Sequence, residues 1–235
     1  MKQICFAAMA ATLTLLSACS KSGDDQMPSG NYVSSKILIA GVKMYTGNGE
    51  VTDQSLINRY IASRDLQRFF KSAQTEEPET GLVTISLEPG KATVKYPGQP
   101  MTMEMSYRQT GNGRYLLNWV GKTLWQMPNP NFRCMQMGDS ILQYPVNKLN
   151  IVSIPDAGGY STFYTPSFDY VLNVKAGTLT APFLSYAFSN DNHPYSACSS
   201  ANGDVWNMFN PGCLARLRNG DTLVVQSKTV LLKKQ

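Results

Sequence analysis

Strict alternation of apolar and polar residues over 83–119 is the feature that most constrains the fold of this chain. Apolar residues recur at every second position in four segments, which are 83–88, 91–96, 101–107 and 115–119. Short turn sequences that contain glycine separate the four segments. Since side chains alternate between the two sides of a strand, this pattern predicts a four-stranded antiparallel meander with one buried face.

Further β-type segments flank the meander and set the fold class. The chain opens with a predicted strand over 32–45, broken at Gly41. Later strands are predicted at 141–144, 149–154, 161–164, 169–174 and 178–188, and a closing hairpin pairs 214–218 with 222–232 around Asn219-Gly220. About ten antiparallel strands need protected edges, and closure into a barrel provides that protection. We therefore predict a mainly β fold, an antiparallel meander that closes into a lipocalin-like barrel, with a β-sandwich as the alternative.

One segment, 52–71, changes to helical spacing. Leu56, Ile57, Tyr60 and Ile61 recur at intervals of three and four residues, which indicates one apolar helix face. Thr52 or Asp53 is suited to accept hydrogen bonds from the free N–H groups of the first turn. The sequence thus predicts one N-terminal helix, packed on or beside the barrel.

The N-terminus has the form of an export signal. Lys2 precedes a run of thirteen residues, 4–16, that is apolar and too short to span a membrane as a helix. The following Leu16-Ser17-Ala18-Cys19 resembles the lipobox of bacterial lipoproteins, in which the signal is cut before the cysteine. The resemblance implies a signal peptide over 1–18 and acyl chains on Cys19 that hold the protein on a membrane. Cleavage after Ala18 as an ordinary secretory signal is the alternative.

Residues 19–30 then form the lipidated cysteine and a flexible polar tether, and a single β-rich domain is expected over 31–235. Ser20 after the cysteine resembles the sorting signal for the outer membrane in diderm bacteria, and Asp24-Asp25 resembles signals for export to the cell surface. We expect an outer-membrane lipoprotein, on the periplasmic face or the cell surface.

Three cysteines remain beyond the signal and the anchor: Cys134, Cys198 and Cys213. An oxidising envelope compartment favours one disulfide, and three pairings are possible. Cys198–Cys213 is the predicted pair, because it closes a short loop that contains two turn sequences. Cys134 would then be a buried free thiol.

Aromatic residues gather in the second half of the chain. Eleven of the 24 aromatic residues lie between Tyr160 and Phe209. A long loop is predicted over 190–212, and we expect Tyr195 and Trp206 to be exposed there. Tyr195, Trp206 and Phe209 are the candidate ligand-binding residues, because aromatic rings stack on sugars and line apolar pockets. The alternative is that these aromatic residues belong to the core of the sheet.

Sequence motifs give little support to catalysis. The chain has a single histidine, His193, so a site with three histidine ligands is excluded, and the cysteine spacing does not match a metal site. Phosphate-binding and dinucleotide-binding glycine motifs are absent, and no cofactor is expected. The formal net charge of +5 is spread along the chain, so no concentrated basic face for nucleic acid is indicated.

Two segments resemble parts of uncharacterised Bacteroidota lipoproteins. They are 43–53 (KMYTGNGEVTD) and 220–230 (GDTLVVQSKTV), at the two ends of the predicted domain. The resemblance implies the shared layout of lipobox, polar spacer, early helix and β domain. It implies no activity, because none is assigned to these proteins.

Taken together, these features predict a non-catalytic, lipid-anchored envelope protein that binds a ligand or a partner protein. The first hypothesis is a small apolar ligand or a glycan, held at the barrel mouth or by the 190–212 loop. The second is a structural or interaction module of an outer-membrane complex, which would bind an envelope protein. A hydrolase is the third.

Overall fold

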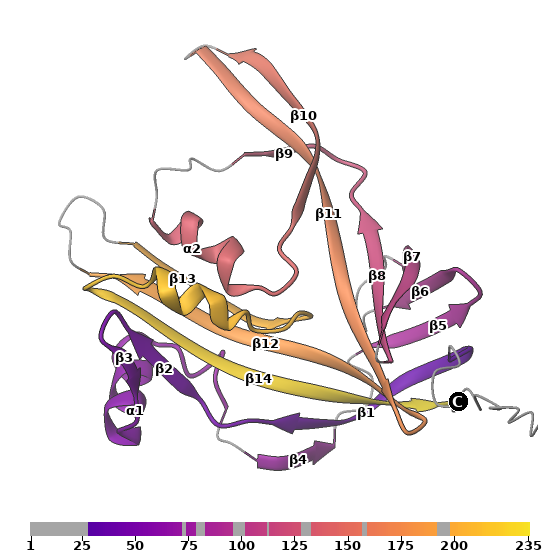
Figure 1. The fold of residues 1–235 in the computed structure, drawn as a ribbon, viewed down its shortest axis with the longest axis horizontal. Helices are drawn as coiled ribbons and strands as arrows, with labels where there is room; N and C mark the ends of the chain where they lie inside the picture. Colours follow the sequence, from indigo (N-terminus) through magenta and orange to yellow (C-terminus); the bar gives the residue numbers. More distant parts are fainter. Residues whose placement is uncertain are drawn as a thin grey trace, which may run out of the picture.

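Eight antiparallel strands close into a barrel, and their order around it is their order in the chain (Figure 1). These strands are β1 (Gly30–Ile39), β5 (Thr84–Glu88), β6 (Lys91–Lys95), β7 (Thr102–Gly111), β8 (Arg114–Val120), β11 (Gly159–Lys175), β12 (Thr178–Asn190) and β14 (Asp221–Lys234). Pairing of β14 with both β12 and β1 completes the circle. The predicted lipocalin-like barrel is confirmed, and with it the meander, which forms β5 to β8.

The computed structural model describes residues 28–71, 74–78, 83–95, 102–111, 113–127, 133–156, 159–191 and 198–235. The predicted signal peptide, Cys19 and most of the tether lie outside these residues, as do His193 and Tyr195. Within the described ranges, no helix has the length and apolar character needed to cross a bilayer.

Three insertions interrupt the barrel. Between β1 and β5 lie β2 (Lys43–Thr46), β3 (Gly49–Val51), α1 (Gln54–Ser63) and β4 (Gln74–Pro78). Between β8 and β11 lie β9 (Trp125–Gln126), α2 (Arg133–Ile141) and β10 (Asn147–Asp156). Between β12 and β14 lie β13 (Cys198–Val205) and the 3-10 helix η2 (Pro211–Arg216). The eight strands thus form a plain up-and-down barrel, and the other described helices and strands lie in the three insertions.

The predicted helix forms, but it is shorter than 52–71. Its N-cap is Asp53, whose Oδ1 accepts hydrogen bonds from the backbone N–H groups of Ser55 (2.8 Å) and Leu56 (3.4 Å). It ends at Ser63, because Asp65 takes a left-handed conformation (φ 53°) and the N–H of Leu66 turns back to the carbonyl of Ile61 at 3.0 Å. This is the Schellman arrangement that usually places glycine at the position of Asp65.

The left-handed residue after α1 gives a stability prediction. Replacing Asp65 with glycine is expected to raise the free energy of unfolding by about 0.5–1 kcal/mol, because glycine adopts positive φ without the steric penalty of a Cβ atom. Asp65→Ala is the matched control, since it removes the carboxylate and keeps the Cβ atom. Urea unfolding of the three proteins measures the difference. A glycine variant no more stable than the alanine variant would contradict the explanation.

The two strands β11 and β12 part soon after the turn that joins them, as Figure 1 shows. Only Asn173–Lys175 pairs with Thr178–Thr180. Trp206, which directly follows β13, fills the opening: its Nε1–H donates to the carbonyl of Val171 at 2.7 Å and its ring stacks on Phe183 at 5.6 Å. An indole thus supplies the hydrogen bond that β12 no longer offers to β11.

Beyond this opening, the β12 strand is covered on both sides. Residues 183–189 are all buried, whereas a strand with one solvated face would alternate. Ala187 packs with Ile61 of α1, and the neighbouring Phe188 packs with Met137 of α2. The two helices therefore cover opposite faces of the same strand.

Two strand predictions are wrong. Ile141 ends α2, so 141–144 is not a strand, and 214–218 lies largely in η2, so the closing hairpin does not form. Segment 198–205 forms β13 on the edge of β12, whereas the sequence predicted a loop from 190 to 212. In each case the short segment adopts the conformation that its packing against β12 and β14 allows, and local propensity does not reveal that packing.

Candidate functional site

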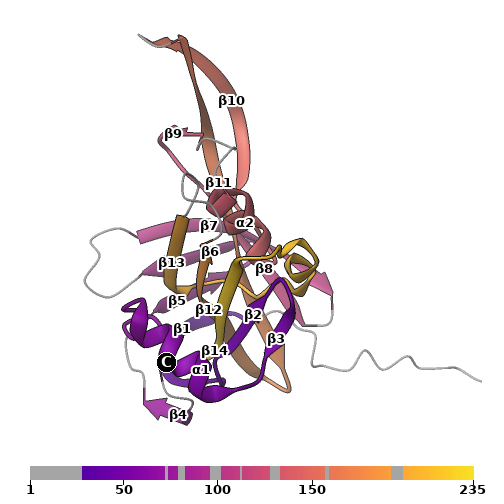
Figure 2. The same cartoon turned by 90° about the vertical axis from the view of Figure 1, so that its left-hand side faces the viewer.

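A ribbon of three strands projects from the barrel (Figures 1 and 2). It consists of β10, the first half of β11 (159–168) and β9, and we call it the ribbon. β10 pairs with one edge of β11, from Asp156 opposite Gly159 to Asn147 opposite Ser167. β9 pairs with the other edge of β11 at Phe163 and Tyr164. The ribbon extends beyond the barrel core, so neither of its two faces is covered by the barrel along most of its length.

The pairing register divides the ribbon residues between two faces. Residues opposite each other in an antiparallel pair lie on the same face. One face, the aliphatic face, comprises Leu149, Val152, Ile154 and Phe163. The other, the aromatic face, comprises Trp125, Tyr160 and Tyr164 with Ser153 and Thr162. A register shift between Leu149 and Val152 marks a bulge at the root of β10.

The aliphatic face is open to solvent. Leu149 is 39% exposed, Val152 41% and Ile154 44%. In the described chain, eight of the eleven exposed large apolar side chains lie on the ribbon or in the segment 120–124 that leads to it. Such clustering of apolar side chains on a protein surface marks an interaction site.

The ribbon also lacks charge over most of its length. Segments 149–155 and 159–168 contain no Lys, Arg, Asp or Glu, and every residue of 149–155 is exposed. Exposed β edges normally carry charged residues that prevent association. The composition of the ribbon is therefore that of a contact surface rather than of a solvated edge.

On the aromatic face, neighbouring rings hold Trp125 in place. Its indole makes edge contacts with Tyr164 (6.4 Å, 70°) and Phe168 (5.5 Å, 69°), yet it remains 43% exposed. Lys148 lies 5.9 Å above the ring of Tyr164 and 3.1 Å from the carboxylate of Asp139. Burial raises the pKa of Tyr164 although Lys148 works in the other direction, so the phenol is neutral at physiological pH.

The rings continue from the ribbon into the barrel as one aromatic row. Phe168 follows Trp125, with Trp119 beside it at 5.6 Å. Tyr170, Trp206 and Phe183 come next, with centroid separations of 6.2, 5.3 and 5.6 Å. Burial raises the pKa of Tyr170 to about 12. The inner end of the row is core, and only its outer end reaches the surface.

The predicted loop site does not assemble. Trp206 is only 3% exposed, so the expectation that it lies on the surface is wrong. Phe209 is half-buried, stacks on Tyr45 at 6.1 Å and belongs to the core cluster of α2, apart from Trp206. Tyr195 lies outside the described residues. The indole of Trp206 therefore serves the barrel core, as the alternative interpretation of the aromatic residues had it.

The predicted disulfide is also wrong, because Cys198 pairs with Cys134. The start of α2 lies against the start of β13, with a Cα separation of 6.0 Å for the pair. The bond closes a 64-residue separation, and chain-entropy arguments give it about 4 kcal/mol of stabilisation. Cys213 is a buried thiol whose pKa burial raises to about 11, so the reactive thiolate does not form near neutral pH.

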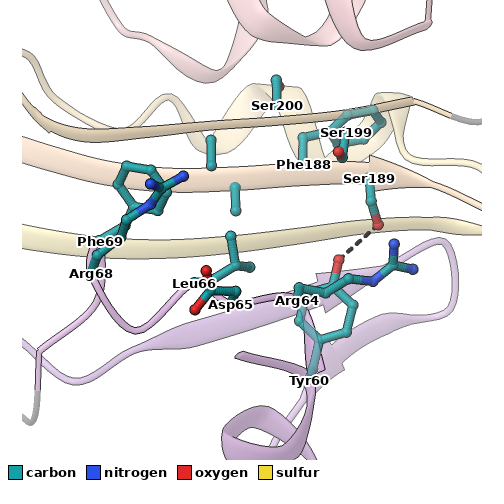
Figure 3. Close-up of a pocket in the computed structure, with 12 residues that line it drawn as sticks. Tyr60, Arg64, Asp65, Leu66, Arg68, Phe69, Phe188, Ser189, Ser199 and Ser200 are labelled. Atoms are coloured by element: carbon teal, nitrogen blue, oxygen red, sulfur yellow. Dashed lines mark hydrogen bonds between the residues drawn. The ribbon is translucent and has the colours of Figure 1, made fainter. Parts of the chain in front are cut away.

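A separate pocket of about 270 Å³ lies between the end of α1 and strands β12 and β13 (Figure 3). Two of its polar groups have partners, since the hydroxyl of Tyr60 is 2.7 Å from that of Ser189 and Arg64 is 2.5 Å from Asp191. The buried hydroxyl of Ser200 has no hydrogen-bond partner among the described residues. Arg68 lies over the ring of Phe69 at 4.7 Å. The pocket is slightly smaller than the usual range for ligand pockets and its Tyr60 and Arg64 side chains are already paired, so it is a weaker candidate than the ribbon.

Sequence reasoning located strands at 149–154 and 161–164 but did not predict that they leave the barrel. The available signals were the adjacent Ile151 and Val152, which break the alternation, and the absence of charge around them. No group of three or more metal-ligating side chains occurs among the described residues. Comparison of the chain with protein-family models, with curated proteins and with solved structures finds no match.

Proposed function

We propose that this chain is a non-catalytic, lipid-anchored protein of the cell envelope that binds a partner protein through the aliphatic face of the ribbon. The observation that carries the proposal is the exposed, uncharged row of Leu149, Val152 and Ile154 on an element that projects from the barrel. The buried centre of a protein interface is more apolar than the rest of the surface and depleted in charge. The partner surface is accordingly apolar and uncharged.

Two observations favour a protein over the other occupants. The barrel interior holds a cluster of nineteen buried side chains, Trp206 among them, which argues against a small apolar ligand enclosed there. A lipid bilayer is disfavoured because β10 pairs with β11 alone among the described strands. In hydrocarbon, its free backbone edge would have no hydrogen-bond partner, whereas a protein surface supplies one.

The envelope location rests on Cys19 and on the oxidised cysteine pair. The lipobox resemblance at Leu16–Cys19 supports a lipid anchor on the outer membrane. The Cys134–Cys198 bond supports an oxidising compartment, where such bonds persist. An interaction module of an outer-membrane complex fits both, with the ribbon as its contact element.

Photo-crosslinking from two adjacent positions tests the proposal. A photoreactive amino acid at Ile154, on the aliphatic face, is expected to give one specific crosslinked protein in intact cells of the producing organism. The same residue at Ser153, on the aromatic face, is the matched control and should not capture that protein. With the captured partner purified, Ile154→Asp is expected to weaken binding by about 30-fold or more, the cost of a charge in an apolar interface centre. Equal capture from both positions, or unchanged affinity, would contradict the assignment.

A further inference from the structure

The aromatic face of the ribbon carries a second arrangement that the partner-binding proposal does not use. The ring of Trp125 is fixed without a ligand, because it packs edge-on against Tyr164 and Phe168, and it is still 43% exposed. β9 is itself hydrogen-bonded to β11 at this point. A fixed, exposed ring loses little conformational entropy on binding, which is the basis of preorganised recognition.

The rings are spaced along a line. Tyr160, Thr162 and Tyr164 alternate along β11 on the same face, with Tyr160 76% exposed. Tyr164 is only 6% exposed and lies opposite Trp125, so the two exposed rings are Tyr160 and Trp125. At the usual rise of a strand, these two rings are about 13 Å apart along β11. This separation is longer than a single ligand ring, so it fits an extended ligand that has more than one flat apolar surface.

Hydroxyl groups and one ion pair accompany the rings. Ser153 and Thr162 face each other with their hydroxyl oxygens 3.5 Å apart. At the root of the face, Lys148 and Asp139 form an ion pair with 31% and 54% of their side chains exposed. These groups offer both donors and acceptors, and the two charges cancel.

The chemistry that matches this combination is carbohydrate. Sugar rings present apolar C–H faces that stack on aromatic rings, and their hydroxyl groups both donate and accept hydrogen bonds. A polyanion such as nucleic acid would require a net basic face, and the described aromatic face has none. We propose that the aromatic face binds an extended neutral oligosaccharide along β11, with Trp125 and Tyr160 as its stacking platforms.

Affinity electrophoresis of the full-length protein in detergent tests the inference. Native gels would contain dextran, mannan, xylan or laminarin as neutral probes, and heparin as the charged probe. We expect at least one neutral polysaccharide to retard the protein and heparin not to do so. Trp125→Ala and Tyr160→Ala are each expected to weaken the retardation about tenfold, since each removes a stacking ring.

Two features keep the test falsifiable. Tyr160 is 76% exposed, so its loss leaves the fold unchanged even if Trp125→Ala loosens β9. The double variant Val152→Ser and Ile154→Ser alters only the aliphatic face and should keep full retardation, so a failure here is separate from a failure of partner binding. Absence of retardation with every neutral polysaccharide, retardation only with heparin, or full retardation of Tyr160→Ala would overturn the proposal.

Discussion

Replacing Trp206 with alanine is expected to lower the free energy of unfolding by about 3–5 kcal/mol. The ring is only 3% exposed and lies between Tyr170, at 5.3 Å, and Phe183, at 5.6 Å. Its removal leaves a cavity at the place where β11 and β12 have parted. It also leaves the carbonyl of Val171 without the indole donor.

Chemical denaturation of the wild type, Trp206→Ala and Trp206→Phe separates these two causes. The phenylalanine variant keeps an aromatic ring and loses the N–H group, so it is expected to lose about 1–3 kcal/mol, the cost of one unsatisfied buried carbonyl. The alanine variant should be clearly less stable than the phenylalanine variant. A loss below about 1 kcal/mol for Trp206→Ala would show that the opening is closed by something other than this side chain.

The barrel was predictable from sequence because its signal is local and repeated. Alternation over 83–119 with short turns fixes four neighbouring strands and their common buried face. The Asp53 cap and the apolar face of α1 are local in the same sense, and both are found. Closure of β14 onto β1 follows once the number of strands makes an open edge costly.

Pairings between distant segments were not predictable in this way. The Cys134–Cys198 bond depends on α2, and the nine residues of α2 carry no distinctive helical signal beyond Met137 and Ile141 on one side. Spacing along the chain favoured Cys213 for this bond, although the fold places Cys213 in the core as a thiol. Sequence distance and spatial distance diverge most where an insertion folds back on the frame.

Trp206 shows the same limit for function. Its position between two turn-rich segments suggested a loop and hence an exposed ring. In the fold it enters the gap between two strands, where an indole is both large enough and able to donate a hydrogen bond. For the ribbon, the error was the opposite: segments 149–154 and 161–164 were predicted as ordinary barrel strands, but they are exposed. Their exposure depends on how far β11 extends beyond β8, which the sequence does not reveal.

The insertions, rather than the barrel, therefore distinguish this chain from a plain eight-stranded frame. β9 and β10 extend β11 into the ribbon, and α2 packs on β12 in the region where β11 has left it (Figure 1). α2 precedes β10 in the chain, and it is fixed to β13 through the Cys134–Cys198 bond and to β14 through the ion pair of Arg133 with Asp221. The contribution of this ion pair to the free energy of unfolding is itself testable.

Replacing Asp221 with asparagine is expected to cost about 3–5 kcal/mol, because it leaves Arg133 as a buried charge without its partner. The Asp221 side chain is fully buried and accepts from Arg133, from the Asn190 amide (2.7 Å) and from the Arg218 N–H (2.8 Å). Burial alone would raise the pKa of Asp221, but these donors outweigh it and hold the pKa below its ordinary value of 3.8. The carboxylate thus links the start of β14 to α2, to the end of β12 and to the turn after η2.

The sign of the pH dependence follows from that lowered pKa. The ionised carboxylate contributes its full stabilisation above pH 3.8, and the contribution is lost as the pH falls through the lower pKa of the folded state. Denaturation curves between pH 7 and pH 2 should show a steeper acid loss for the wild type than for Asp221→Asn. Arg133→Met with Asp221→Asn should cost less than the sum of the single changes, since the pair is removed together. Additive losses and identical acid slopes would mean that Arg133 and Asp221 do not act as a pair.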